Sequence, residues 1–252
     1  MQLSGNTILI TGGGSGIGLG LSRAFHALDN QVIIAGRRKD LLDRVAATLP
    51  GTRTVQLDVG NADAIERFAD EAKDSLPSLN VLINNAGIQR PEILRAGQHD
   101  LADAAEMVET NLLGPVRLTS ALLPLLQGRP KSAILNVTSG LAFVPGAGVA
   151  TYSATKAAMH SYTLSLRQQL RHTTTEVIEI IPPYVQTDLG PNHGSDPRAM
   201  PLQDFIGEVV RILQEHPGAE EVVVERCKPL RHAAETGSFQ AAFDRLNGGV
   251  VF

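Results

Sequence analysis

Short apolar runs alternate with longer stretches of helical periodicity along most of the 252 residues of this chain. The runs are rich in Val, Ile and Leu, and apolar residues in the stretches between them recur three or four positions apart. Strands that are apolar throughout are typical of parallel sheets with helices on both faces. The expected strands are residues 7–11, 31–35, 54–57, 81–83, 133–137, 177–181 and 221–224. We therefore predict an α/β fold with a doubly wound parallel sheet of about seven strands.

The expected helices fill the segments between these strands. Long helices are predicted at 101–126 and 151–171, another at 202–215, and a last one near 231–246. No internal repeat, low-complexity tract or linker divides the sequence. Residues 1–252 are therefore expected to form a single domain, with a variable loop at about 188–201 and a tail at about 225–252.

Composition excludes several classes of partner. Lys and Arg number 22 against 26 Asp and Glu, and a net charge of −4 offers no broad electrostatic footprint for nucleic acid or an anionic membrane. No apolar run approaches the roughly 18 residues of a membrane span, and no signal peptide is recognisable. The single cysteine, Cys227, excludes an intrachain disulfide and suits a reducing compartment. A cytoplasmic protein without nucleic-acid or membrane partners is expected.

A glycine-rich turn joins the first predicted strand to the first helix. Its residues are Gly12, Gly14, Ser15, Gly16, Ile17 and Gly18. Backbone N–H groups and a helix N-terminus at such a turn can bind a pyrophosphate, and glycine permits its close approach. The spacing differs from G-x-G-x-x-G, and a GxxxxGK[ST] loop is excluded because no Lys follows. In a Rossmann-type sheet this turn would bind a dinucleotide; a merely tight strand–helix turn is the alternative.

The end of the second strand discriminates between cofactors. A carboxylate at this position would bind the ribose hydroxyls of NAD, but here Gly36 is followed by Arg37 and Arg38. Guanidinium groups bind phosphate through charge-assisted hydrogen bonds, so the pair favours NADP(H) over NAD; a solvated helix start is the alternative. Asp58, at the end of the third strand, could accept a hydrogen bond from adenine or could simply cap a turn.

Tyr152 and Lys156 are four residues apart on a predicted helix, so they share one face. A nearby ammonium favours the phenolate, so the pKa of Tyr152 is expected to be lowered, as a general acid/base near neutral pH requires. Ser139 follows the strand 133–137, at the sheet edge where ligands bind, and can donate to a carbonyl. The alternatives are an ordinary aromatic–lysine pair and routine turn chemistry at Ser139.

With these residues, the sequence resembles the short-chain dehydrogenase/reductase family between residue 7 and about residue 189. The matching residues are Thr11-Gly12-x-x-x-Gly16-x-Gly18, Asp58-Val59, Asn84-Asn85-Ala86-Gly87, Asn111, Ser139, Tyr152-x-x-x-Lys156 and Pro182-Pro183-Tyr184-Val185-Gln186-Thr187. The resemblance implies a catalytic tetrad of Asn111, Ser139, Tyr152 and Lys156. Tyr152 would be the general acid in reduction and Ser139 would orient the carbonyl. Lys156 would hold the nicotinamide ribose, and Asn111 would support a water-linked proton path.

The resemblance also implies further cofactor contacts. These are residues 84–87, including Asn85, Ala86 and Gly87, and beyond them Val59, Val185 and Thr187. Three departures stand out. Pro183 replaces the family's usual glycine, Ser15 stands where many NADP members have a basic residue, and the glycine-rich end of the last strand is missing. The tail resembles that of a subgroup labelled as D-alanine lipoteichoic-acid esterification oxidoreductases.

The leading function hypothesis is an NADP(H)-dependent carbonyl reductase or alcohol dehydrogenase acting on a small-molecule carbonyl or alcohol. A non-catalytic NADP(H)-binding sensor or scaffold protein on the same fold is the alternative. No H-E-x-x-H motif or paired cysteine spacing occurs, so no metal is expected. The substrate is expected between the segments 88–97, 140–150 and 184–201. The helices 101–126 and 151–171 need a further apolar partner, so a homodimer or homotetramer is expected.

Overall fold

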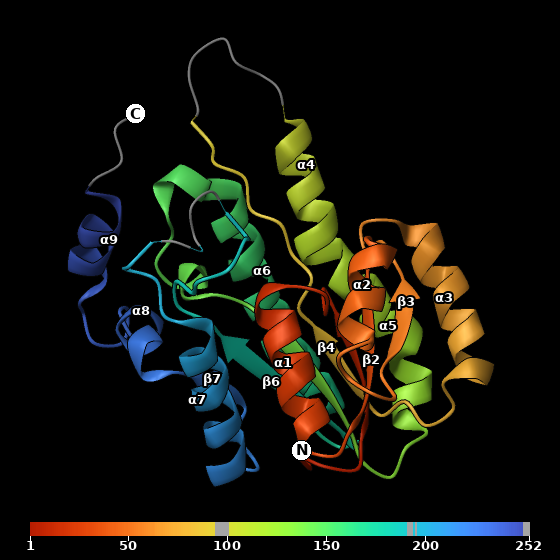
Figure 1. Ribbon diagram of the computed structural model, residues 1–252. Helices are drawn as coiled ribbons and strands as arrows, with labels where there is room; N and C mark the ends of the chain where they lie inside the picture. Colours follow the sequence, from red (N-terminus) through yellow and green to blue (C-terminus); the bar gives the residue numbers. More distant parts are fainter. Residues whose placement is uncertain (94–100, 191–193, 195, 249–252) are drawn as a thin grey trace.

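The computed structural model describes residues 1–93, 101–190, 194 and 196–248. Within these residues, seven parallel strands form one sheet in the order β3-β2-β1-β4-β5-β6-β7 (Figure 1). The strands are β1 Thr7–Thr11, β2 Gln31–Gly36, β3 Arg53–Gln56, β4 Val81–Asn84, β5 Ser132–Val137, β6 Thr175–Ile181 and β7 Glu221–Val223. The predicted parallel sheet is confirmed, and each boundary agrees within two residues.

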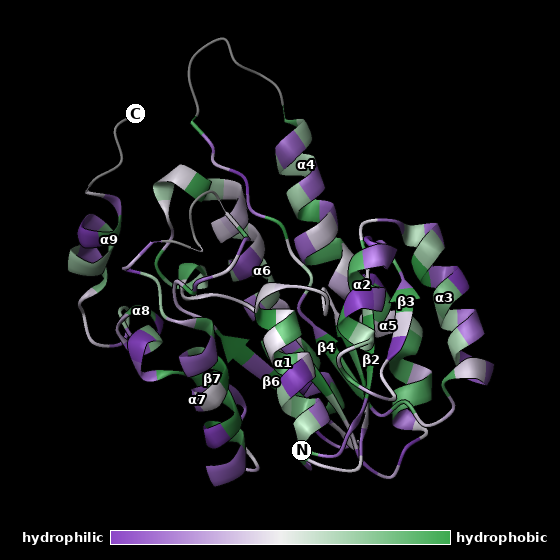
Figure 2. Cartoon of the chain, viewed as in Figure 1, coloured by the Kyte–Doolittle hydropathy of each residue, from purple (hydrophilic) through white to green (hydrophobic). Residues whose placement is uncertain are grey.

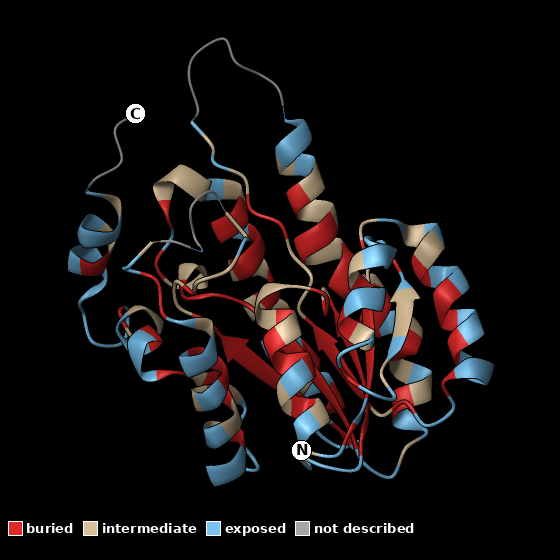
Figure 3. Cartoon of the chain, in the orientation of Figure 1, coloured by how far each residue is buried: buried red, intermediate tan, exposed pale blue. Residues whose placement is uncertain are grey.

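Two apolar layers sandwich this sheet, because successive side chains of a strand point to opposite faces. Ile8 and Ile10 of β1 belong to one layer, and Leu9 between them belongs to the other. All three are fully buried, and most residues of the inner strands are apolar and buried (Figures 2 and 3). The near-continuous apolar runs of the sequence therefore reflect burial on both faces.

Helices cover both faces of the sheet. One face packs against α1 Gly16–Ala27, α2 Lys39–Ala46 and α7 Leu202–Glu215. The other packs against α3 Ala62–Ser75, α5 Gly114–Gln127 and α6 Ala150–Leu170. The helices predicted at 202–215 and 151–171 are thus confirmed. No described helix is long and apolar enough to cross a bilayer.

The helix predicted at 101–126 is a continuous helical run with a wide turn in its middle. It comprises α4 Ala102–Val108, a π-helical turn at Glu109–Leu113, and α5. Gly114 follows the π turn, where an added Cβ would lie 2.4 Å from the carbonyl oxygen of Val59. The wide turn carries Asn111, and π turns within α-helices are frequent at functional sites.

The single helix predicted near 231–246 is wrong. The segment forms two short helices, α8 Lys228–Arg231 and α9 Phe239–Asn247. Between them Gly237 adopts a φ of +69°, a left-handed conformation that ends helical geometry. The backbone N–H of Ser238 bonds back to the carbonyl oxygen of Ala233, which closes the turn. The tail therefore folds back on itself before α9 begins.

Candidate active site

A cleft of about 700 Å³ lies at the carboxyl ends of the strands. Strand order reverses between β1 and β4, and ligands of doubly wound sheets bind at such a reversal. A smaller hollow of about 180 Å³ adjoins it. The glycine-rich turn, the segment 85–90 and the start of α6 line the cleft, whereas the ends of β2 and β3 line the hollow.

The glycine-rich turn presents bare backbone to the cleft. Gly12 and Gly16 have φ angles of +67° and +50°, which favour glycine. They line the cleft with Ser15 and Ile17, while Gly14 lines the hollow. Gly18 lies among the lining residues of neither space, and a Cβ there would lie 2.2 Å from the carbonyl oxygen of Gly12. Gly18 therefore permits the close approach of α1 to the turn.

The hollow brings together Arg37, Arg38, Asp58 and Val59, four of the residues expected to contact the cofactor. The Arg38 guanidinium donates to the hydroxyl of Ser15 at 3.4 Å, so the second strand and the glycine-rich turn meet here. Arg37 is exposed, and among the described residues its guanidinium makes one long contact of 3.4 Å, with the carboxylate of Glu106 in α4. Both guanidinium groups are therefore available to an anion. Asp58 lines the hollow and also accepts the N–H of Gly60 at 2.9 Å, as a turn aspartate does.

Tyr152, Lys156 and Ser139 meet in the cleft. The Nζ of Lys156 lies 5.6 Å from the centroid of the Tyr152 ring and donates to the carbonyl oxygen of Val137 at 2.8 Å. Ser139 hydrogen-bonds the Tyr152 hydroxyl, and its own Oγ accepts the N–H of Leu141 at 3.1 Å. The helix α6 and the end of β5 thus place a phenol, an ammonium and a hydroxyl together.

Burial sets the protonation of this pair. It raises the pKa of Tyr152 to about 12, although the hydrogen bond from Ser139 works in the opposite direction. It lowers the pKa of Lys156 to about 8, partly offset by the negative charge of Glu179. The expectation that Lys156 lowers the pKa of Tyr152 is therefore not met here. Desolvation of the phenolate outweighs an ammonium that is itself desolvated and bonded to a backbone carbonyl.

Asn111 supports the cleft from behind. Its Oδ1 accepts the N–H of Ile88 at 2.8 Å, and its Nδ2 donates to the carbonyl oxygen of Ile88 at 2.8 Å and to Thr155 at 3.3 Å. Asn111 is buried and is not among the residues lining the cleft, whereas Ile88 is. A Cβ on Gly87 would lie 3.3 Å from Oδ1 of Asn111 and 3.8 Å from Nζ of Lys156. The side-chain amide of Asn111 thus holds the backbone at Gly87 and Ile88 close to Lys156.

Of the predicted segment 84–87, only Asn85, Ala86 and Gly87 line the cleft. The side chain of Asn84 is buried and donates to Thr119 at 3.0 Å and to Asn136 at 2.9 Å. Asn84 therefore joins β4 to β5 and α5, because the side chain of a strand residue points to a face of the sheet rather than beyond its edge.

The loop after β6 supplies the opposite wall. Val185 and Thr187, which we expected to contact the carboxamide, line the cleft. The loop is fixed by backbone bonds of Met200 with Tyr184 at 2.8 Å and with Gln186 at 2.9 Å. Among the described residues, no backbone hydrogen bond involves position 183, so a proline there is accommodated. Residues 94–97, 191–193 and 195 of the segments expected around the substrate lie outside the described residues.

The tail lines the cleft through Leu230 and Leu246, which the sequence did not indicate. Leu230 also reaches Gly140, where an added Cβ would lie 2.8 Å from its Cδ1. These contacts join residues about 90 positions apart or more in the chain. No local sequence pattern predicts these contacts, because an apolar residue in a short helix can pack against any part of the protein.

Comparison with known proteins identifies the family. Residues 6–198 match the family model described as short chain dehydrogenase. The chain belongs to the short-chain dehydrogenase family. It is an oxidoreductase with the nicotinamide-binding fold of that family, as the sequence resemblance implied.

Relatives and solved structures agree with this assignment. The chain is 39% identical over 251 residues to the uncharacterized oxidoreductase DltE of Bacillus subtilis, with 98% of each chain covered. It is 30% identical to the uncharacterized oxidoreductase SA2266 of Staphylococcus aureus, covering 88% of this chain and 97% of the relative. Among solved structures, a short chain dehydrogenase from Burkholderia cenocepacia in complex with NADP has a TM-score of 0.81 and 28% identity, covering 98% of this chain and 99% of that chain. One from Burkholderia phymatum in complex with NAD also has a TM-score of 0.81, at 20% identity, covering 95% and 96%, and shares the fold.

Proposed function

We propose that this short-chain dehydrogenase uses NADP(H) to reduce a ketone or aldehyde to an alcohol, or catalyses the reverse reaction, with Tyr152 as general acid/base. The observation that carries the proposal is the buried group of Tyr152, Lys156 and Ser139 in the cleft beside the glycine-rich turn. A sensor or scaffold protein would need the cofactor site but not this group. The proposal therefore rests on site chemistry in addition to the fold.

The turn fits a dinucleotide. Gly12 and Gly16 let the turn lie against two other cleft-lining segments, since a Cβ would be 2.9 Å from Nδ2 of Asn85 and 3.3 Å from Cβ of Thr187 respectively. The N-terminus of α1 at this point favours a phosphate. Lys156 would hold the nicotinamide ribose, while Val185 and Thr187 would contact the carboxamide. Bound there, the nicotinamide would supply the hydride.

The phenol of Tyr152 would give its proton to the carbonyl oxygen as the alcohol forms. Ser139 would donate a hydrogen bond to the same oxygen and fix the face presented to the nicotinamide. With its pKa raised to about 12 by burial, Tyr152 holds its proton at neutral pH, which suits reduction. Lys156 would stabilise the phenolate left after transfer. Asn111 would act through the backbone it holds and through the proton path that the family resemblance implies.

NADP(H) is proposed over NAD(H) because of the hollow beside the turn. Arg37 and Arg38 line it where a ribose-binding carboxylate would otherwise stand, and Arg38 reaches Ser15 of the turn. Two guanidinium groups at this place suit a 2′-phosphate. The neighbour from Burkholderia cenocepacia binds NADP, which supports the same choice.

The substrate is proposed to be a carbonyl compound with an apolar body. Apolar side chains line part of the cleft, namely Leu141, Val149, Leu189, Leu230 and Leu246, and the first three pack against the cluster that contains Tyr152. The loop at 188–201 and the tail at 225–252 contribute to this wall and would set the specificity of a single-domain enzyme. Cys227 is buried beneath Gly140, and burial raises the pKa of its thiol to about 12, so it supplies no nucleophile.

A homodimer or homotetramer remains our proposal for the assembly. The helix α6 leaves Leu164 43% exposed and carries small residues on its outer side, which permit close approach of another helix. Sedimentation at micromolar concentration tests this, and a monomer alone would contradict it. A reducing, cytoplasmic setting is proposed on the single buried cysteine.

The test of function is NADPH oxidation with a panel of aliphatic and aromatic ketones and aldehydes. NADPH oxidation that depends on the carbonyl compound, and that is faster than NADH oxidation with the same compound, supports the proposal. Tight NADPH binding without turnover of any compound, in either direction, would favour the sensor or scaffold protein.

A further inference from the structure

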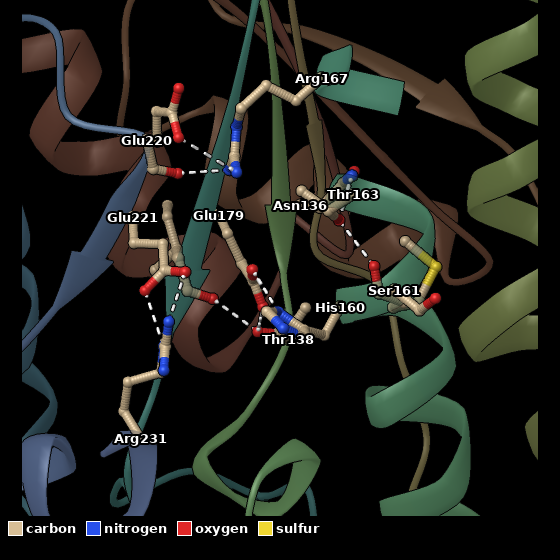
Figure 4. Close-up of polar contacts among 12 residues, drawn as sticks. Asn136, Thr138, His160, Ser161, Thr163, Arg167, Glu179, Glu220, Glu221 and Arg231 are labelled. Carbon is tan, nitrogen blue, oxygen red and sulfur yellow. Dashed lines mark hydrogen bonds and ion pairs between the residues drawn. The ribbon is translucent and has the colours of Figure 1, made fainter. Parts of the chain in front are cut away.

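The fully buried carboxylate of Glu179 lies behind the active site. Glu179 belongs to β6, pairs with Asn136 of β5 on one side and with Glu221 of β7 on the other, and is 0% exposed. Its Oε1 accepts the hydroxyl of Thr138 at 2.6 Å, and its Oε2 lies 2.8 Å from Nδ1 of His160 (Figure 4). Because a carboxylate only accepts, Nδ1 of His160 is the donor in this contact. A buried charge with two donors is satisfied, whereas an unpaired one would be costly.

Both donors adjoin residues of the active site. Thr138 immediately precedes Ser139, and His160 follows Lys156 by one turn of α6. The ammonium of Lys156 donates to Val137, the residue before Thr138. Glu179 is therefore tied to the β5 end that carries Ser139 and to the helix face that carries Lys156.

The other charges facing Glu179 come from β7 and α8. Glu221 belongs to the same cluster, since ligand atoms of His160, Glu179 and Glu221 lie within 4.8 Å of one another. Both oxygens of Glu221 accept from Arg231, at 2.7 and 2.9 Å. The Arg231 guanidinium also lies 4.7 Å from the centroid of the Phe143 ring, which packs edge-on against His160. The Arg231 guanidinium thus binds the two Glu221 oxygens that a metal ion at this cluster would need. Because Arg231 neutralises Glu221, the negative charge of Glu179 acts on the groups of α6.

We propose that Glu179 is a positioning residue for the reaction, acting on Ser139 through the Thr138 hydroxyl and on Lys156 through its buried negative charge. This rests on the proposed function for the role of Ser139 and Lys156. Burial disfavours the ammonium of Lys156, and an opposite charge inside the same low-dielectric region counters that effect. A positively charged Lys156 is what the phenolate of Tyr152 needs after proton transfer.

The direct test is the titration of Lys156 in Glu179→Gln. The substitution removes the charge but keeps the shape. The amide oxygen still accepts from Thr138, and the amide N–H donates to His160 once its other tautomer forms. The chain has five lysines, so NMR of protein labelled at the lysine side chains resolves them, and Lys156→Met identifies the signal of interest. We expect Glu179→Gln to move the Lys156 titration to lower pH by about one unit. Glu220→Gln, which removes an exposed carboxylate beside the same strand, serves as the control.

An unchanged Lys156 titration in folded Glu179→Gln, or an equal shift in Glu220→Gln, would overturn the electrostatic part of the proposal. This measurement needs neither cofactor nor substrate. A wild-type protein that reduces no carbonyl compound would defeat the proposed function, and the titration would still decide whether Glu179 acts on Lys156.

The contact through Thr138 is tested by kinetics. Thr138→Val keeps the volume and removes the donor, whereas Thr138→Ser keeps the hydroxyl. We expect kcat of Thr138→Val to fall about tenfold with little change in the KM for NADPH, and Thr138→Ser to restore most of it. A kcat that is the same in both variants and in the wild type would show that the Thr138 contact does not position Ser139.

Discussion

The ammonium of Lys156 lies 5.6 Å from the centroid of the Tyr152 ring, one turn further along α6, and both side chains are buried. Proximity alone does not lower the pKa of this tyrosine, because burial acts on the phenolate more strongly. The pair instead combines a protonated phenol with an ammonium that titrates not far above neutral pH. This combination has consequences for stability, for turnover and for their pH dependence.

The first prediction concerns stability against pH. Burial lowers the pKa of Lys156 from 10.5 to about 8, so between these values the unfolded chain binds more protons than the folded one. The contribution of Lys156 to the free energy of unfolding should therefore rise from pH 8 to pH 10, by up to about 3 kcal/mol. Lys156→Met, which cannot titrate, should lack this rise. Denaturant unfolding of both proteins at several pH values measures the difference, and parallel curves would contradict the buried ammonium.

The second prediction concerns the hollow that receives the adenosine end of the cofactor. Arg37→Ala and Arg38→Ala should each weaken NADPH binding by about 1.5–3 kcal/mol and leave NADH binding nearly unchanged, because only NADPH carries the 2′-phosphate. Arg44→Ala is the matched control, since Arg44 is an exposed arginine of α2 paired with Asp40 at 3.0 Å. Titration of each variant with both cofactors gives the dissociation constants. Equal losses for NADPH and NADH would assign the arginines a role unrelated to phosphate.

The third prediction separates two helical glycines. A Cβ on Gly18 would lie 2.2 Å from the carbonyl oxygen of Gly12, so Gly18→Ala must displace α1 or the glycine-rich turn. We expect a loss of about 1–3 kcal/mol in the free energy of unfolding, and weaker cofactor binding. Gly207 of α7 has no atom within 4 Å of such a Cβ. Gly207→Ala should therefore stabilise the protein by about 0.5–1 kcal/mol. Thermal unfolding compares the two variants: we expect Gly18→Ala to lower the melting temperature and Gly207→Ala to raise it.

The fourth prediction concerns the tail. Leu246→Ala removes an apolar side chain from the wall of the cleft and should raise the KM for carbonyl compounds with apolar bodies, by several-fold to tenfold. The dissociation constant of NADPH should not change. Leu101→Ala, at a leucine that is 65% exposed, is the control and should leave both constants as they are. If Leu246→Ala changes neither constant, the tail does not contact the substrate.

The sequence predicted the sheet because its signal is local. Runs such as Ile8–Ile10 are apolar throughout only when both faces are covered, and this pattern can be read without knowing the partners. The glycine-rich turn and the Tyr152–Lys156 spacing are local in the same sense, so these residues were found. The π turn at Asn111 was missed because it leaves the apolar periodicity of the helix almost unchanged.

Other properties depend on contacts between distant segments. The roles of Gly18 and Asn84 follow from which backbone or side chain lies opposite, and sequence spacing alone does not give this. The raised pKa of Tyr152 follows from burial, whereas the sequence showed only the neighbouring charge. Glu179 is the one acidic residue of the predicted strand 177–181, an anomaly in an apolar strand that could have drawn attention to it.

The central claim is that Tyr152 donates the proton during carbonyl reduction, and Tyr152→Phe tests it most directly. The variant keeps the ring and removes only the hydroxyl, and Tyr162→Phe, at a tyrosine of the same helix, is the matched control. The measurement is the turnover of the best carbonyl substrate with NADPH, together with the dissociation constant of NADPH, on protein shown to be folded by circular dichroism. We predict that turnover by Tyr152→Phe falls about 100- to 10,000-fold while NADPH affinity changes little, and that Tyr162→Phe behaves as the wild type. Near-normal turnover by folded Tyr152→Phe would contradict the proposed mechanism.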